Sequence, residues 1–368
     1  MSGTSMDGVD AVACDIRITK KLPRIRILAS AKMAYSTSLK NRLISLSASS
    51  NSLGEVCELN VAVAEVFAKS AIKVMAHPEL KGRKVKIIGS HGQTIWHAPK
   101  AHATLQIGDG AVIAAKTGAS VWSDFRSADM ANDGEGAPLA PIVHSPLFGD
   151  KRRNISVVNI GGIANITHIP AGATDLSKLI AYDTGPGNML IDLAVNRMRK
   201  GMYDRGGRIA ASGTVDEKLL KRFLAHPYFK RRSPKSTGRE TFGESFIKWA
   251  GLSKSRLNAS VVATFTELTA RTIAGEITKL EKSGKSTDRL VICGGGAKNR
   301  YLLKRIESIL PKTMEVVRSD QLGVPCQLVE GSLIALLAFY ADNGVRLDLS
   351  SITGAKNRSV LLGRLTPV

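Results

Sequence analysis

The chain reads Ser156-Val-Val-Asn-Ile-Gly-Gly-Ile-Ala-Asn-Ile-Thr-His-Ile169 near its middle, two apolar segments joined by a glycine pair. Short apolar runs bounded by glycine are typical of buried β-strands, and the tight connection predicts a hairpin. Near the N-terminus, the glycine-containing stretch Gly3–Gly8 leads in the same way into the apolar stretch Val9–Ile16. The similarity suggests a duplicated nucleotide-binding hairpin, one in each of two domains.

Strand-like and helix-like segments alternate along the rest of the chain. Val9–Ile18 and Arg24–Met33 have the pattern of strands, and Lys84–Gly89 that of a short buried strand. Between them, Leu53–Met75 places apolar residues at helical spacing and is followed by a proline. This alternation predicts an α/β fold.

Length and composition are those of a globular protein. The 368 residues are 43% hydrophobic and 23% charged, which argues for two domains or one large unit with a cleft. The proline-containing stretch Ala137–Pro146 is the best candidate for a domain boundary. We expect an N-terminal lobe of residues 1–140, with about 345–368 returning to it, and a C-terminal lobe of residues 141–344.

Targeting signals are not evident in the sequence. The longest apolar run, Leu333–Ala341, is too short to span a membrane, and the first ten residues lack the pattern of a secretory signal. The four cysteines are far apart and form no CxxC pair. We therefore expect a cytoplasmic protein with no membrane partner.

The net charge of +21 raises the possibility of nucleic-acid binding. The basic clusters, however, are short and scattered, and aromatic residues make up only 5% of the chain, too few to form a stacking platform. We expect no specific nucleic-acid partner. The sequence does not decide the oligomeric state, for which a homodimer is one candidate.

The stretch Gly3-Thr4-Ser5-Met6-Asp7-Gly8-Val9-Asp10 combines glycines, hydroxyls and carboxylates. Glycines allow backbone N–H groups to approach a phosphate, hydroxyls add donors, and a carboxylate such as Asp7 can hold hydrated Mg²⁺. A capped surface turn would have the same composition. The chain contains no Walker, GxGxxG, HExxH or GxSxG motif, which argues against the commonest dehydrogenase, metalloprotease and hydrolase classes.

Two further glycine-rich loops follow predicted strands. Asp183-Thr-Gly-Pro-Gly-Asn188 places a carboxylate at a strand end, and Leu290–Cys293 leads into Gly294-Gly-Gly-Ala-Lys-Asn299, where a flat ring could lie against the backbone. Either loop alone could be a tight turn. Together with the first loop they suggest a nucleotide cradled between two domains.

Six motifs together resemble the anhydro-N-acetylmuramic acid kinase family, in the family's order and over nearly the whole chain. They are Met1–Asp10, Gly89–Thr94, Asp124–Arg126, Asn159–Asn165, Asp183–Asn188 and Cys293–Asn299. The resemblance implies two actin-like, ribonuclease H-like lobes with an ATP-binding cleft between them. It also implies ATP- and Mg²⁺-dependent phosphorylation of 1,6-anhydro-N-acetylmuramic acid with hydrolytic opening of the anhydro ring, in peptidoglycan recycling.

The same resemblance implies roles for individual residues. Asp183 matches the catalytic base, and Arg126 and Glu330 match positions that face the sugar and its attacking water. His91 either contacts substrate or satisfies a structural hydrogen bond. Mg²⁺ would be held mainly through ATP and water. The expected ATP-binding residues are Gly3, Thr4, Ser5, Met6, Asp7, Gly8, Val9, Asp10, Asn159, Gly161, Gly162, Asn165, Gly294, Gly295 and Gly296.

Two departures from the family pattern stand out. Relatives carry apolar residues before the Met-Ser-Gly-Thr-Ser motif, which begins here at Met1, so we expect the native protein to begin upstream. After Glu330 the chain reads Gly331-Ser-Leu-Ile334, where the family tends to have alanine and phenylalanine, and we expect repacking without a change in chemistry.

Three alternatives remain open. The chain could phosphorylate another anhydro-sugar, such as levoglucosan, which lacks the lactyl carboxylate of muramic acid. It could be a non-catalytic ATP-binding module, against which the carboxylate of Asp183 in a glycine loop argues. It could bind nucleic acid through its positive charge.

Overall fold

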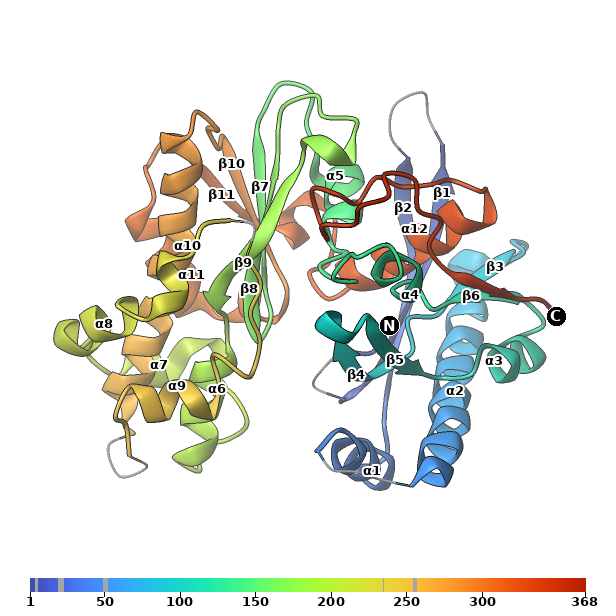
Figure 1. The fold of residues 1–368 in the computed structure, drawn as a ribbon, viewed down its shortest axis with the longest axis horizontal. Helices are drawn as coiled ribbons and strands as arrows, with labels where there is room; N and C mark the ends of the chain where they lie inside the picture. The colour runs from blue at the N-terminus through green and yellow to red at the C-terminus, as the bar shows by residue number, and fades with distance from the viewer. Residues whose placement is uncertain (4–5, 19–22, 49–51, 234, 254–256) are drawn as a thin grey trace. The chain divides into compact units, whose positions relative to one another are not determined.

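The computed structural model describes residues 1–3, 6–18, 23–48, 52–233, 235–253 and 257–368. The chain divides into two compact units, each built from helices and strands as the α/β expectation requires (Figure 1). Unit 1 comprises Met1–Leu147, Thr174–Ser177 and Gln327–Val368, and unit 2 comprises Phe148–Ala173 and Lys178–Cys326. No helix among the described residues is both long and apolar enough to cross a membrane.

Unit 2 is built on a five-stranded sheet. Its strands are β7 (Ile155–Ile160), β8 (Ile163–Ile169), β9 (Ile180–Pro186), β10 (Arg289–Cys293) and β11 (Glu315–Arg318), in the order β11-β10-β7-β8-β9. β7, β8 and β9 are antiparallel neighbours, and β10 and β11 continue the sheet parallel to β7. This order and these directions are those expected of a ribonuclease H-like lobe, and the predicted hairpin at Gly161-Gly162 is confirmed.

The helices of unit 2 bury an aromatic core. They are α6 (Met189–Arg197), α7 (Arg208–Ala211), α8 (Glu217–Leu224), α9 (Glu244–Trp249), α10 (Ala259–Lys282) and α11 (Arg300–Ile309). α10 begins where the Asn258 side chain accepts a hydrogen bond from Val261 N. Within this core the ring of Phe223 stacks on that of Phe265 and is tilted against that of Phe246.

Unit 1 contains three small groups of strands. β1 (Gly8–Arg17) and β2 (Arg24–Ala34) form an antiparallel ribbon, and β4 (Gln93–Ala98) and β5 (Ala103–Ile107) form a second. A third group has the order β12-β6-β3, made of β3 (Ile87–Gly89), β6 (Ser120–Ser123) and β12 (Arg364–Thr366). β3 is parallel to β6, and β12 is antiparallel to it.

Six α-helices accompany these strands in the described part of unit 1. They are α1 (Thr37–Ala48), α2 (Leu53–Met75), α3 (Gly110–Thr117), α4 (Ser127–Met130), α5 (Pro141–Phe148) and α12 (Val329–Asp342). The bounds of α2 are those predicted from helical spacing: Ser52 caps it by accepting from Glu55 N, and Leu59, Val63 and Phe67 are buried on one face. The strand predicted at Lys84–Gly89 is shorter and begins at Ile87.

The division of the chain differs from the expected boundaries at both crossings. The first crossing falls at Leu147 and Phe148, after residue 140, and the return falls at Gln327, well before residue 345. The second difference places all of α12, with Glu330, in unit 1. The physical reason is that α12 packs closely against β1 and β3. A Cβ on Gly331 of α12 would come within 2.7 Å of Val12 Cγ1 in β1. A Cβ on Gly89 of β3 would come within 2.5 Å of Ile334 O in α12.

Candidate functional site

Three polar side chains stand in one row across the sheet of unit 2. Asn159 of β7 pairs with Asn165 of β8, and Asn165 pairs with Asp183 of β9. Directly paired residues of neighbouring strands point to the same face, with Cβ atoms about 5 Å apart. The register therefore brings two carboxamides and one carboxylate together near the glycine turn that joins β7 to β8.

The backbone around Asp183 is held on both sides. Its carboxylate Oδ2 accepts from Thr237 N at 2.9 Å, its N–H donates to Lys235 O at 3.0 Å, and its carbonyl accepts from the Tyr228 hydroxyl at 2.8 Å. Burial raises the pKa of Tyr228 above its usual range, and the negative charge of Asp183 adds to the rise. The phenol therefore stays a neutral donor, and the carboxylate is kept in place by the 235–237 segment.

Two glycine turns are joined to each other beside the row. Gly187 N and Asn188 N donate to Gly162 O and Gly161 O, each at 2.8 Å, so the β9–α6 turn is fastened to the β7–β8 turn. Asn188 Nδ2 adds a bond to Gly161 O at 3.1 Å. β7 and β9 both end here, and the carboxyl ends of strands in an open α/β sheet are where ligands commonly bind.

The triple glycine after β10 has two different parts. A Cβ on Gly294, whose φ is +79°, would lie 2.2 Å from Asn159 Oδ1, and one on Gly296 would lie 2.3 Å from Ile160 Cγ2. These two glycines permit close packing against the end of β7. Gly295 is exposed, and a Cβ added there would have Asn188 Nδ2 at 4.0 Å as its nearest contact, so only its backbone offers a flat surface to a ligand. This arrangement fits a planar group such as a purine.

In unit 1, the expected phosphate loop is closed by side chains outside it. Ser2 Oγ donates to Gln93 Oε1 at 2.7 Å and lies 2.8 Å from Gly8 O, and Gln93 Nε2 donates to Gly3 O at 3.3 Å. Gly8 has φ +154°, and a Cβ there would lie 2.2 Å from Met33 O, so the β1–β2 pairing requires glycine at this point. Thr4 and Ser5 lie outside the described residues.

The carboxylates of this loop are paired with lysines. Asp7 is exposed and forms an ion pair with Lys40, and Asp10 Oδ1 lies 3.9 Å from Lys32 Nζ. Val9 is buried in the core and Met6 is largely so. Within the described part of the chain, no group of three or more histidine, cysteine, aspartate or glutamate side chains could hold a metal ion. The residues present therefore fit an ion that arrives with a phosphate ligand better than one held by protein side chains alone.

His91 and Arg126 form a polar pair in unit 1. Arg126 Nη2 and Nε lie 2.9 and 3.2 Å from His91 Nε2, and Nη1 donates to Gly136 O. Burial and then the Arg126 charge lower the pKa of His91 to about 3. Because arginine can only donate, His91 Nε2 accepts, and its Nδ1–H donates to Gly92 O at 3.0 Å. A neutral imidazole thus orients the guanidinium.

Glu330 lies in the first turn of α12, near the charges of Met1, Asp10 and Arg126. Surrounding protein raises the pKa of its carboxyl, and the Met1 ammonium and Arg126 oppose the rise, although the side chain itself stays exposed. Glu330 also acts on Arg126 in return, since its charge favours the protonated guanidinium. The structure therefore brings Arg126, His91 and Glu330 into one electrostatic neighbourhood.

The expected site residues thus fall into two groups. Unit 2 holds the Asn159–Asn165–Asp183 row with its glycine turns, and unit 1 holds the N-terminal loop with His91, Arg126 and Glu330. Sequence reasoning missed the roles of Ser2, Gln93 and Thr237, whose hydrogen bonds hold the N-terminal loop and the Asp183 carboxylate in place. Gln93 lies in the Gly89–Thr94 motif and Ser2 in the Met1–Asp10 motif, which are the sequence signals for these two residues. Nothing local marks Thr237.

Comparisons with known proteins agree with the motifs. The sequence model of the family described as "Anhydro-N-acetylmuramic acid kinase" matches residues 1–368. A protein of that name from Sulfurovum sp. (strain NBC37-1) is 39% identical over 367 residues, covering 99% of this chain and 97% of the relative. One from Gloeobacter violaceus (strain ATCC 29082 / PCC 7421) is 39% identical over 373 residues, covering 100% and 97%.

Among solved structures the likeness is distant. The activator of the 2-hydroxyisocaproyl-CoA dehydratase from Clostridium difficile with bound ADPNP is 13% identical, with a TM-score of 0.42 and coverage of 90% of this chain and 96% of that one. The family model and the curated relatives span essentially the whole chain. The chain therefore belongs to the anhydro-N-acetylmuramic acid kinase family.

Proposed function

We propose that the chain phosphorylates 1,6-anhydro-N-acetylmuramic acid with ATP while water opens the anhydro ring, giving N-acetylmuramic acid 6-phosphate. The reaction would serve peptidoglycan recycling, and we place it in the cytoplasm. The observation that carries the proposal is the carboxylate of Asp183, which stands at the end of a polar row beside two joined glycine turns. A nucleotide-binding module without catalysis has no need of a base at this position.

The chemistry assigned to Asp183 is proton removal from water. The water oxygen attacks the anomeric carbon, and the bond from that carbon to the bridging oxygen breaks. The released six-oxygen takes the γ-phosphoryl group of ATP, whose bond to the β-phosphate oxygen breaks so that ADP leaves. Asp183 accepts the proton, and its Oδ2 is oriented for this by Thr237 N at 2.9 Å. Because the carboxylate is already oriented in the folded protein, less entropy is lost when the transition state forms, and the barrier is lower.

Nucleotide binding is assigned to glycine-rich backbone in both units. Bound ATP would supply the phosphoryl group, and Mg²⁺ bound with it would offset the charge that develops on that group. In unit 2, Asn159, Asn165 and the Gly161-Gly162 turn would face phosphate, and Gly295 would face the adenine. In unit 1, the backbone of Gly3–Asp10 would hold phosphate, with Asp7 available to a hydrated metal once it separates from Lys40.

Sugar recognition is assigned to the polar neighbourhood of unit 1. Arg126 presents a charged guanidinium oriented by His91, which suits the lactyl carboxylate of muramic acid. Glu330 would accept hydrogen bonds from sugar hydroxyls or from the attacking water. Levoglucosan has no carboxylate, so the charge of Arg126 favours the muramic substrate over that alternative.

The test is mass spectrometry of 1,6-anhydro-N-acetylmuramic acid incubated with the protein, ATP and Mg²⁺ in ¹⁸O-water. We expect one product that carries one phosphoryl group and one ¹⁸O atom at the anomeric carbon. Asp183→Asn is the matched control, because it keeps the shape of the side chain but cannot take the proton.

Each alternative function predicts a different result. Turnover of levoglucosan with a kcat/KM similar to that for 1,6-anhydro-N-acetylmuramic acid would show that the lactyl group does not determine specificity. ATP binding without product from either sugar would favour the non-catalytic module. A phosphorylated product without ¹⁸O would contradict the coupled ring opening.

A further inference from the structure

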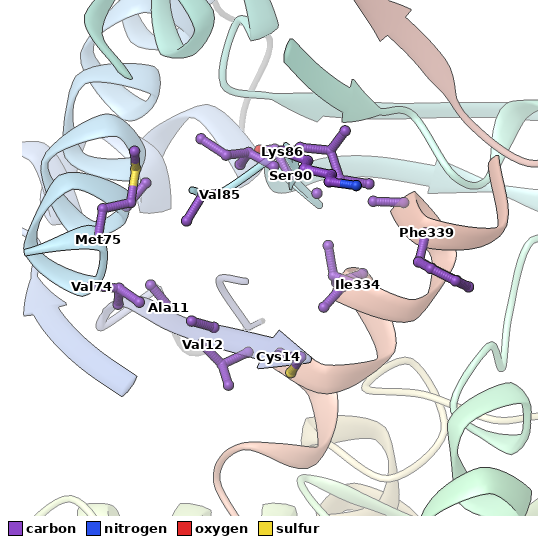
Figure 2. A pocket seen from close by; sticks show the side chains of 18 of the residues that line it. Ala11, Val12, Cys14, Val74, Met75, Val85, Lys86, Ser90, Ile334 and Phe339 are labelled. Atoms are coloured by element: carbon purple, nitrogen blue, oxygen red, sulfur yellow. The ribbon is translucent and has the colours of Figure 1, made fainter. Parts of the chain in front are cut away.

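Unit 2 encloses a charged pair next to the segment that supports Asp183, whereas the cavity of unit 1 is mainly apolar. That cavity has a volume of about 490 Å³, and β1, α2 and α12 contribute apolar side chains to its walls (Figure 2). In unit 2, Lys235 Nζ lies 2.8 Å from Glu276 Oε1 of α10, and the two side chains are 1% and 6% exposed. A buried ion pair contributes little net stability, because the cost of removing both charges from water offsets most of their attraction. Its importance therefore depends on what the pair holds in place.

The Lys235 end of the pair is connected to Asp183 by two routes. The Lys235 carbonyl oxygen accepts from Asp183 N at 3.0 Å. The Lys235 ammonium lies 4.9 Å from the centroid of the Tyr228 ring, and the Tyr228 hydroxyl donates to Asp183 O at 2.8 Å. Two residues further along the chain, Thr237 N donates to Asp183 Oδ2 at 2.9 Å. A displacement of the buried lysine would therefore move groups that are bonded to both the backbone and the carboxylate of Asp183.

The Glu276 end of the pair is connected to the residue that precedes Asp183. Burial, the charge of Glu276 and a hydrogen bond between the Tyr182 hydroxyl and Glu276 all raise the pKa of Tyr182 above its usual range. Glu276 lies on α10, whose many buried residues make it a rigid support. The backbone of β9 at Asp183 is therefore linked to α10 through Tyr182 on one side and through the buried lysine on the other.

The charges around Asp183 come from three elements. Burial raises the pKa of Tyr228, the charges of Asp183 and Glu276 raise it further, and Arg231 opposes the rise, so this phenol lies close to both carboxylates. Arg231 is exposed, and water and salt screen its charge. The Lys235 ammonium is enclosed and is screened much less. An enclosed cation near a carboxylate favours the ionised form of that carboxylate.

We propose that Lys235 is a positioning residue for the reaction: Glu276 holds its ammonium, its segment fixes Asp183, and its charge keeps the Asp183 carboxylate ionised. A base must be ionised to accept the proton of water, and a fixed carboxylate loses less entropy on reaching the transition state. The inference rests on the role proposed for Asp183 as the base. The ionisation of Asp183 can nevertheless be measured without turnover.

The test reads the ionisation of Asp183 from the amide signal of Thr237, because this amide is bonded to Asp183 Oδ2. In the full chain labelled with ¹⁵N-threonine, the signal is assigned as the one that Thr237→Ser removes. Its chemical shift is followed by nuclear magnetic resonance from about pH 8 to about pH 4, the range below which an unperturbed aspartate is protonated. Asp183→Asn is the control and should abolish this titration, because an amide side chain does not ionise.

Variants of the ion pair should move the titration midpoint in opposite directions. Lys235→Met removes the buried cation and leaves Glu276 with Lys279, so the midpoint should rise by about half a pH unit or more. Glu276→Gln leaves the Lys235 charge unopposed, so the midpoint should fall. Lys235→Arg keeps the charge and should restore most of the parental midpoint. Lys279→Met removes an exposed cation and should leave the midpoint unchanged.

Kinetics provide the second readout. Lys235→Met should lower kcat of sugar phosphorylation by about 10- to 100-fold with KM for ATP and for the sugar nearly unchanged, because the base is misplaced while the binding groups remain. The acidic limb of its pH–rate profile should move to higher pH, in the same direction as the Thr237 midpoint. Lys235→Arg should recover part of the lost kcat.

The two opposite shifts separate an effect of charge from a general loosening of unit 2, which would move both midpoints in the same direction. Thermal melts establish that each variant is folded, and where Lys235→Met does not fold, the shift in Glu276→Gln decides. An unchanged midpoint in the folded variants, or shifts of the same sign in Lys235→Met and Glu276→Gln, would overturn the inference. A parent chain whose variants show the expected shifts but which makes no phosphorylated sugar would contradict the proposed function and leave the effect of Lys235 on Asp183 in place.

Discussion

The buried ion pair between Lys235 and Glu276 provides a sharp test of how unit 2 is held together. Lys235 Nζ lies 2.8 Å from Glu276 Oε1, and the two side chains are 1% and 6% exposed. Lys235 Nζ also lies 4.9 Å from the centroid of the Tyr228 ring. Glu276 has a second lysine, Lys279, at 2.8 Å, but that side chain is 55% exposed.

The perturbation is Glu276→Gln, which keeps the shape and removes the negative charge. Lys235 would then remain buried with a neutral acceptor, and breaking a buried pair on one side costs about 3–5 kcal/mol. We expect a value near the lower limit, about 3 kcal/mol, because the amide oxygen still accepts a hydrogen bond and the Tyr228 ring still faces the cation. Lys279→Met is the control, and an exposed pair of this kind contributes at most about 1 kcal/mol.

Urea unfolding is the assay, read from the fluorescence of Trp249 in unit 2. The variants are made in a background with Trp96→Phe and Trp122→Phe, because two compact units need not unfold in one step. A loss below about 1 kcal/mol for Glu276→Gln, or the same loss for Lys279→Met, would refute the reasoning. It would mean that water reaches Lys235 and that the segment supporting Asp183 is less enclosed than the structure indicates.

Three further predictions concern chemistry, pH and packing in unit 2. Asp183→Asn should lower kcat of sugar phosphorylation by about 10²- to 10⁴-fold while calorimetry shows unchanged ATP affinity, and near-normal turnover would assign the base to another carboxylate. Burial, with the nearby charge of Asp204, raises the pKa of Asp192 from 3.8 to about 7. Between about pH 4 and 7 the folded state therefore keeps a proton on Asp192 that the unfolded state has released. The free energy of unfolding should fall as pH rises through this range. Thermal melts of Asp192→Asn should lack this part of the fall, and identical pH profiles would contradict the assignment. Gly294→Ala should lower the thermal midpoint and weaken nucleotide binding, because residue 294 has a φ of +79° and the new Cβ would lie 2.2 Å from Asn159 Oδ1. A variant that melts and binds ATP like the parent chain would show that this turn can relax.

Local patterns in the sequence were enough to predict several elements. The helical spacing of Leu53–Met75 and the glycine pair between β7 and β8 are properties of neighbouring residues, and both elements formed as expected. A helix or a hairpin is encoded by periods of 3.6 and 2 residues and by turn glycines, which can be read without knowing what packs against them. The ordered motifs extended this to the family and to the candidate site residues.

The arrangement of those residues depended on contacts between distant parts of the chain. Strand register alone aligns Asn159 with Asp183, and the bond from Ser2 to Gln93 of β4 joins residues 91 positions apart in the sequence. The sequence likewise marked neither Thr237 as a support for Asp183 nor α12 as part of unit 1. Strand register and helix placement depend on which apolar faces are buried against each other. That burial involves residues far apart in the sequence, so the local spacing of apolar residues does not reveal it.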